Sequence, residues 1–173
     1  MSKAFTKDDA WEEPIIPPRA PIPAGVQNYV TPRGLGLLRA ELAALETERH
    51  GLETERGDEA EYRRRLAIVA GRTRDLTARL ASAELVEPGQ QPHDEVRFGA
   101  SVTLRTVGGE RAGEERRLEI VGIDEADAAR GRMAFTAPIA RAILGRGVGD
   151  RVALATPRGR DLLEVIAIDY PAD

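Results

Sequence analysis

Two series of apolar residues, one on either side of residue 57, constrain this chain more than any other feature of its sequence. The first is spaced by three, four, three and seven residues, with Arg49 in the one seat that is not apolar; its members are Leu35, Leu38, Leu42, Leu45 and Leu52. The second alternates steps of four and three, and its members are Tyr62, Leu66, Val69, Thr73, Leu76, Leu80 and Ala83. Both spacings follow a heptad, which predicts two helices with one apolar face each.

The two series are arranged symmetrically in sequence. Four pairs of seats have residue numbers that add to 114 or 115: Leu52 with Tyr62, Leu45 with Val69, Leu38 with Leu76 and Leu35 with Leu80. A constant sum indicates that the chain folds back near Gly57, so that each apolar face covers the other. Thr31 followed by Pro32 is typical of a helix start. We therefore predict an antiparallel coiled-coil hairpin over residues 31–86, formed within one chain rather than in a parallel dimer.

Charges differ between the two predicted arms. The first arm carries acids at Glu41, Glu46, Glu48, Glu53 and Glu55, and the second carries arginines at Arg63, Arg64, Arg65, Arg72, Arg74 and Arg79. Opposite charges favour antiparallel association, although each exposed pair contributes only about 0.2–1 kcal/mol. The arginines are interpreted either as a solvated, ion-paired face or as a basic stripe facing a nucleic-acid backbone.

The segments on either side of the hairpin have different compositions. Residues 1–30 contain a cluster of prolines, Pro14, Pro17, Pro18, Pro21 and Pro23, which predicts a disordered, proline-rich tail. An alternative is that Phe5 and Trp11 anchor a short docking segment. Residues 87–94 are rich in proline and glycine and predict a linker. Residues 95–173 contain short β-rich runs and one short helix after Pro138, which predicts a small α+β domain.

Composition excludes several chemistries. The chain of 173 residues has no cysteine, two histidines and a formal net charge of −4. Disulfides, thiol nucleophiles and cysteine zinc sites are therefore excluded, and a histidine metal site is not expected. No apolar run approaches the roughly 20 residues that a membrane-spanning helix needs, and the N-terminus is too polar for a signal peptide. We expect a cytoplasmic protein with no cofactor of its own and no membrane partner.

Several motifs in order along the chain resemble the bacterial GreA/GreB family of transcript-cleavage factors, which act on RNA polymerase. They are VTPRG at 30–34, VRFGASVTL at 96–104, IVGIDEAD at 120–127, APIARAILG at 137–145, VGD at 148–150 and TPRG at 156–159. The resemblance covers roughly four-fifths of the chain and leaves out the tail. It implies an FKBP-like C-terminal domain over 95–173 that docks on the polymerase, and a hairpin that enters the secondary channel.

The same resemblance implies roles for individual residues. At the hairpin tip, Asp58 and Glu59, with Glu61 nearby, would complete the shell of an Mg²⁺ ion shared with the polymerase and act on the RNA 3′ end. The protein would then be no enzyme itself, but would stimulate the nuclease activity of its partner. The residues expected to bind the polymerase are Asp124, Glu125, Asp127, Thr136 and Pro138. Ala137 stands where the family usually has serine, which removes a helix cap.

Other interpretations of the same residues remain open. Asp58 is also a good N-cap for the second helix, with Glu61 three residues later. Each arm is about one heptad, or about 10 Å, shorter than is usual in the family. An alternative is therefore a Rnk-like regulator that occupies the channel as a monomer without stimulating cleavage. Prolyl isomerase activity and a purely structural hairpin are the least favoured alternatives.

Overall fold

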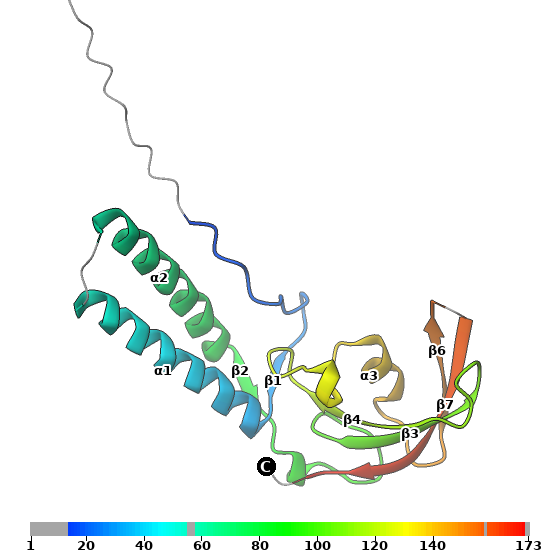
Figure 1. Ribbon diagram of the computed structural model, residues 1–173. Coiled ribbons are helices and arrows are strands. Elements are labelled where there is room, and N and C mark those ends of the chain that lie inside the picture. The colour runs from blue at the N-terminus through cyan, green and yellow to red at the C-terminus, as the bar shows by residue number, and fades with distance from the viewer. Residues whose placement is uncertain (1–13, 55–57, 158, 172–173) are drawn as a thin grey trace, which may run out of the picture.

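The computed structural model describes residues 14–54, 58–157 and 159–171 (Figure 1). It contains a helical hairpin followed by a β domain, as predicted. Helix α1 spans Pro32–Thr54, helix α2 spans Glu59–Ala81, and the two lie side by side in opposite directions. The predicted fold-back residue, Gly57, lies outside the described residues. No helix in the described part of the chain is both long enough and apolar enough to cross a membrane.

Most of the predicted apolar seats form the hairpin core, together with Val30, whereas Leu66 and Thr73 are not among its members. Its fully or nearly fully buried members are Val30, Leu38, Leu45, Leu52, Val69 and Leu76. Leu35, Leu42, Tyr62 and Leu80 pack against them and are partly buried. The prediction of an antiparallel hairpin within one chain is therefore confirmed, because residues from both helices share one buried apolar cluster.

The base of the hairpin carries a small sheet that the sequence pattern does not predict. Strand β1, Asn28–Val30, pairs in parallel with β2, Ala83–Leu85. The Asn28 amide also donates hydrogen bonds to the Arg79 carbonyl at 2.9 Å and to the Ser82 hydroxyl at 3.0 Å. The expected disordered tail over residues 1–30 is therefore wrong for this segment, since β1 is ordered by pairing that comes from 55 residues further along the chain.

The β domain is a curved five-stranded sheet in the order β5-β4-β3-β7-β6. Its strands are β3, Ser101–Gly108; β4, Glu115–Val121; β5, Arg132–Ala134; β6, Arg151–Thr156; and β7, Gly159–Asp169. All neighbours are antiparallel except β4 and β5, which are parallel. The short helix α3, Pro138–Ile143, places Ile139, Ala140 and Ile143 in the core on one face of the sheet.

Two segments before the sheet differ from the expected pattern. Residues 96–98 are one of the short β-rich runs that predict strands, but they form none, because Val96 exchanges backbone hydrogen bonds with Gly145 and Arg146 after α3 instead. The expected linker at 87–94 contains a short 3-10 helix, Pro88–Gln90. Pro88 is buried against Gly99, which has φ +85° and stands so close that a Cβ there would lie 2.9 Å from the proline ring.

Candidate functional site

The three acids expected at the hairpin tip lie at the start of α2, at the end of the hairpin farthest from the β domain (Figure 1). Asp58, Glu59 and Glu61 are all exposed. Asp58 is the N-cap of α2, and its Oδ1 accepts a hydrogen bond from the backbone N–H of Glu61 at 2.9 Å. Glu59 accepts a hydrogen bond from Arg63 at 2.9 Å, with both side chains well exposed. Two of the three acids thus already have partners within α2.

These carboxylates are suited to share a hard cation but not to hold one alone. Oxygen ligands are the ones that Mg²⁺ prefers, and it usually keeps several waters beside one or two carboxylates. Within the ranges that the structure describes, no group of three or more acids, histidines or cysteines could hold a metal ion. A cation at the tip would therefore need further ligands from outside these described ranges.

The acidic loop expected to face a partner instead faces the hairpin. Glu125 is only 4% exposed. Its Oε2 accepts a hydrogen bond from the Thr31 hydroxyl at 2.6 Å, and its Oε1 accepts one from Arg33 Nε at 2.5 Å. A Cβ on Gly34 would lie 2.7 Å from Oε2, so only glycine leaves room for this carboxylate beside α1. In this arrangement Glu125 joins the two units of the chain and has little surface to offer to another molecule.

Asp124 also pairs with residues of the N-terminal segment and the hairpin. Its carboxylate accepts hydrogen bonds from Arg79 at 3.0 Å and from Arg19 at 3.0 Å, and its side chain is 11% exposed. Arg79, which the sequence places in a basic run, is itself buried. Both oxygens of Asp124 are therefore paired within this chain, one with the buried Arg79 and the other with the partly buried Arg19, so a docking role for Asp124 would have to compete with these two pairs.

Arg33 links α1 to strand β4 and to the turn that follows it. It pairs with Glu119 on β4 at 2.5 Å as well as with Glu125. Burial by itself would lower the pKa of Arg33, but hydrogen bonds to Glu119 and Glu125 raise it above the ordinary value. The guanidinium thus stays charged in the joint between hairpin and sheet, where it satisfies two carboxylates.

The remaining expected docking residues lie nearer the surface. Asp127 is partly exposed and pairs with Arg130 at 3.5 Å. Thr136 is half-buried, and Pro138 is exposed at the start of α3. Ala137 is the N-cap of α3 and provides no side-chain hydrogen bond, in agreement with the expected loss of a cap. The segment from η2, Ala128–Arg130, to α3 therefore holds the part of the expected docking surface that is available to another molecule.

An aromatic cluster at the same joint was not predicted. The rings of Tyr29, Phe98 and Phe135 are separated by 5.6–5.7 Å between centroids. They line an open pocket of about 380 Å³ together with Val86 and Leu144. Sequence reasoning missed the cluster because Tyr29 comes from a segment expected to be disordered. The three rings pack against one another, and this contact attaches β1 to the β domain.

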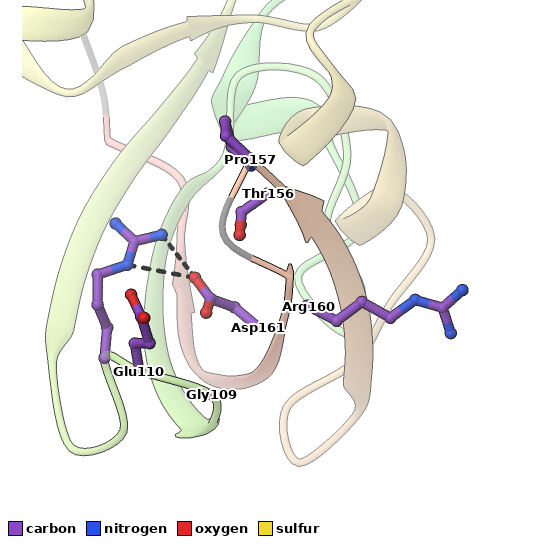
Figure 2. A pocket seen from close by; sticks show the side chains of 7 residues that line it. Gly109, Glu110, Thr156, Pro157, Arg160 and Asp161 are labelled. Atoms are coloured by element: carbon purple, nitrogen blue, oxygen red, sulfur yellow. Dashed lines mark hydrogen bonds and ion pairs between the residues drawn. The ribbon is translucent and has the colours of Figure 1, made fainter.

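A second pocket lies between the β3–β4 and β6–β7 turns (Figure 2). It has a volume of about 360 Å³, and its buried acid, Asp161, pairs with Arg111 at 2.6 Å. Arg160 extends away from the pocket. Gly109 has φ +105°, and a Cβ there would lie 2.6 Å from Asp161 Oδ1. The acid is already neutralised, so the pocket contains a structural ion pair between two turns.

The arginines of α2 are only partly paired. Arg63 bonds Glu59 within the helix, and Arg72 approaches Glu48 across the hairpin at 3.9 Å. Arg64, Arg65 and Arg74 are exposed and have no ion-pair partner in the described part of the chain. Cross-arm ion pairs therefore contribute little to the hairpin, and a basic face remains available along α2.

Comparison with known proteins identifies the class of this molecule. Residues 91–170 match the family described as "Transcription elongation factor, GreA/GreB, C-term". The chain is 35% identical over 158 residues to transcription elongation factor GreB of Neisseria meningitidis serogroup A, covering 83% of this chain and 94% of that protein. It is 37% identical over 155 residues to GreA of Francisella philomiragia, covering 82% and 95%.

Solved structures that the chain matches include transcription elongation factor GreA/GreB from Nitrosomonas europaea. That structure is 23% identical, covers 84% of this chain and 99% of its own, and has a TM-score of 0.41. The sequence relatives decide the assignment, because they match both the hairpin and the β domain. The chain belongs to the GreA/GreB family of transcription elongation factors.

Proposed function

We propose that this protein binds bacterial RNA polymerase through its β domain, as a monomer in the cytoplasm, and inserts the hairpin into the secondary channel. There its tip stimulates the polymerase to cleave backtracked RNA at the 3′ end. The observation that carries the proposal is the position of Asp58 and Glu59, which are exposed at the end of the hairpin farthest from the β domain. Family membership supports it, since the relatives are named transcription elongation factors.

The proposed chemistry belongs to the polymerase. An Mg²⁺ ion shared with the polymerase would orient the attacking water and stabilise charge on the phosphate. Asp58 and Glu59 would supply oxygen ligands, and their exposure and donor type fit such a role. To bind the ion, Glu59 has to release Arg63, and Asp58 has to use the oxygen that does not cap α2. The protein has no nuclease activity of its own in this proposal.

The proposed docking surface consists of Asp127, Thr136 and Pro138. These residues lie on the segment between η2 and α3, where Asp127 and Pro138 are accessible. The burial of Asp124 and Glu125 leaves them the separate task of holding the hairpin against the β domain. Within the acidic loop, Asp127 would then serve docking, whereas Asp124 and Glu125 hold the orientation of the hairpin.

A second candidate function is that of a channel-occupying regulator that does not stimulate cleavage. It is favoured by the prior engagement of Asp58 and Glu59 within α2 and by length. The resemblance to the family implies arms about one heptad shorter than usual, which would reduce the reach of the hairpin by about 10 Å.

A cleavage assay on a stalled elongation complex decides between the two. We expect the native chain to shorten the nascent RNA, and Asp58→Asn and Glu59→Gln to abolish the shortening while polymerase binding persists. Asn caps helices as well as Asp does, so Asp58→Asn removes the charge and keeps the cap. Polymerase binding without shortening by the native chain would establish the regulator.

Two control variants complete this experiment. Glu53→Gln changes an exposed acid of α1 that is not among the expected tip ligands, and should leave cleavage unchanged. Pro138→Glu places an acid in the proposed docking surface and should weaken polymerase binding. A native chain that fails to bind polymerase at all would refute both candidate functions.

A further inference from the structure

The proline-rich segment before β1 lies against both units of the molecule. Arg19 is the central residue of this contact. Its guanidinium donates to both oxygens of Glu41 on α1, at 2.8 and 2.9 Å, and to Asp124 of the β domain at 3.0 Å. A single side chain from the N-terminal segment thus bridges the hairpin and the β domain.

Two further contacts fix the same segment to α2. Arg79 donates a hydrogen bond to the Ala20 carbonyl while it also bonds Asp124. Ile16 lies on the surface of α2 at Gly71, where a Cβ would stand 2.1 Å from the Ile16 Cδ1 atom. Gly71 is buried although it lies in the interior of a helix, where glycine is unfavourable. The absence of a side chain at Gly71 leaves room for Ile16, which covers it.

The composition of the segment suits this role. Pro17, Pro18, Pro21 and Pro23 hold the backbone extended, which lowers the entropy lost when the segment binds a surface. Arg19 is only 22% exposed, and hydrogen bonding to Glu41 and Asp124 raises its pKa, so it remains charged between its partners. The segment therefore combines an ordered backbone, an apolar contact and a bridging charge.

We propose that residues 14–20 form a clamp that binds the hairpin and the β domain together and sets the direction in which the hairpin projects. The surface that the clamp covers is composite: Glu41, Gly71 and Arg79 come from the hairpin, and Asp124 from the β domain. Because Arg19 and Arg79 share Asp124, loss of the clamp also leaves the direct Arg79–Asp124 contact open to water. The clamp involves this chain alone and does not depend on polymerase binding.

The clamp predicts a measurable change in the spacing between the two units. The chain contains no cysteine, so Ala44→Cys on α1 and Ala153→Cys on β6, both at exposed positions, allow two specific spin labels. Pulsed electron paramagnetic resonance on the full chain should give one narrow distance distribution. We expect Arg19→Ala to make the distribution roughly twice as wide, since the hairpin samples further orientations once the bridge is lost.

Matched variants separate the clamp from general effects. Arg39→Ala removes an exposed arginine of α1 and the same charge, and should leave the distribution unchanged. Gly71→Leu occupies the seat of Ile16 without removing a charge and should widen the distribution, whereas Gly36→Leu, with open space around it, should not. Circular dichroism confirms that each variant is folded. An Arg19→Ala distribution as narrow as that of the parent overturns the proposal.

Discussion

Gly34 and Gly71 lie within the continuous helices α1 and α2, at positions where another part of the chain occupies the space of a side chain. At Gly34 the obstacle is the carboxylate of Glu125, and at Gly71 it is the side chain of Ile16. A glycine within a helix costs about 1 kcal/mol relative to alanine. Glycine at these two positions lowers the local stability of the helix, but it permits a close contact with a distant segment of the chain.

Arg116 has buried side-chain donors without hydrogen-bond partners among the described residues. It lies opposite Leu104, a fully buried core residue, and its Nε and Nη2 atoms are buried without a hydrogen-bond partner in the described structure. Burial, together with the nearby charge of Arg111, lowers its pKa. We predict that Arg116→Met raises the free energy of unfolding by about 1 kcal/mol, because an unsatisfied donor is replaced by an apolar chain of similar length.

Urea denaturation measures this difference. Arg105→Met is the matched control, since Arg105 is exposed and its ion pair with Glu115 lies at the surface. The control should change stability by less than about 0.5 kcal/mol. A lower free energy of unfolding for Arg116→Met would contradict the prediction, because it would mean that the guanidinium stabilises the native chain.

Tyr170 provides a prediction at alkaline pH. Its hydroxyl donates to the Glu95 carbonyl at 2.7 Å and accepts from the Arg97 N–H at 3.0 Å. Burial raises the pKa of Tyr170 above its ordinary value. Because an unfolded tyrosine ionises near pH 10, stability from this group is complete below that pH and is lost as the pH rises through the raised pKa.

We therefore expect the native chain to lose stability above about pH 10 and Tyr170→Phe to lose less over the same interval. At neutral pH the variant should be less stable by about 1 kcal/mol, since its hydrogen bonds are removed. Equilibrium unfolding at a series of pH values tests both statements. Parallel pH profiles for the two proteins would contradict the assignment.

At the scale of elements, the hairpin depends on one apolar seam. Leu76 is fully buried between α1 and α2, and the cross-arm ion pair that the structure describes, Arg72 with Glu48, is long and exposed. Apolar burial contributes far more than such a pair. The helices are therefore held by the leucine series that predicted them, and the charge difference between the arms adds little.

Leu76→Ala should accordingly lower the free energy of unfolding by about 2–5 kcal/mol, through lost burial and the cavity that remains. Leu37→Ala, on the same hairpin but 50% exposed, should cost much less. Chemical denaturation of both variants provides the comparison. Equal losses at the two positions would mean that the seam does not dominate hairpin stability.

At the scale of the whole molecule, the joint between hairpin and β domain combines charge, aromatic packing and backbone contact. Glu125 receives hydrogen bonds from Thr31 and Arg33, and Tyr29 packs against Phe98 and Phe135. Gly122 approaches the Tyr29 carbonyl so closely that a Cβ would lie 2.7 Å from the oxygen. These contacts together hold the hairpin in one orientation relative to the β domain.

Glu125→Ala should lower the free energy of unfolding by about 3 kcal/mol, because it leaves part of a buried charge network unpaired. Differential scanning calorimetry should also resolve separate transitions for the hairpin and the β domain in the variant. Glu115→Ala, which removes an exposed partner of Arg105, serves as the control and should retain one transition. A single unshifted transition in Glu125→Ala would show that the joint does not depend on this carboxylate.

The sequence by itself determined the features that repeat locally. Heptad spacing specified two helices and their antiparallel pairing, and Asp58 was recognisable as a helix cap. Strands β3, β4, β6 and β7 follow from short β-rich runs separated by turns. In each case the pattern lies within a few residues of the element, so local spacing carries enough information.

Only the tertiary structure decided which acids face inward and which segment crosses the joint. Asp124 and Glu125 have the sequence of an exposed acidic turn, and residues 14–30 have the composition of an unstructured tail. The two acids pair with Arg19, Arg33 and Arg79. These arginines lie between 45 and 105 residues away from the acids along the chain. Whether a carboxylate is solvated or buried depends on which distant guanidinium reaches it, and no local pattern records that.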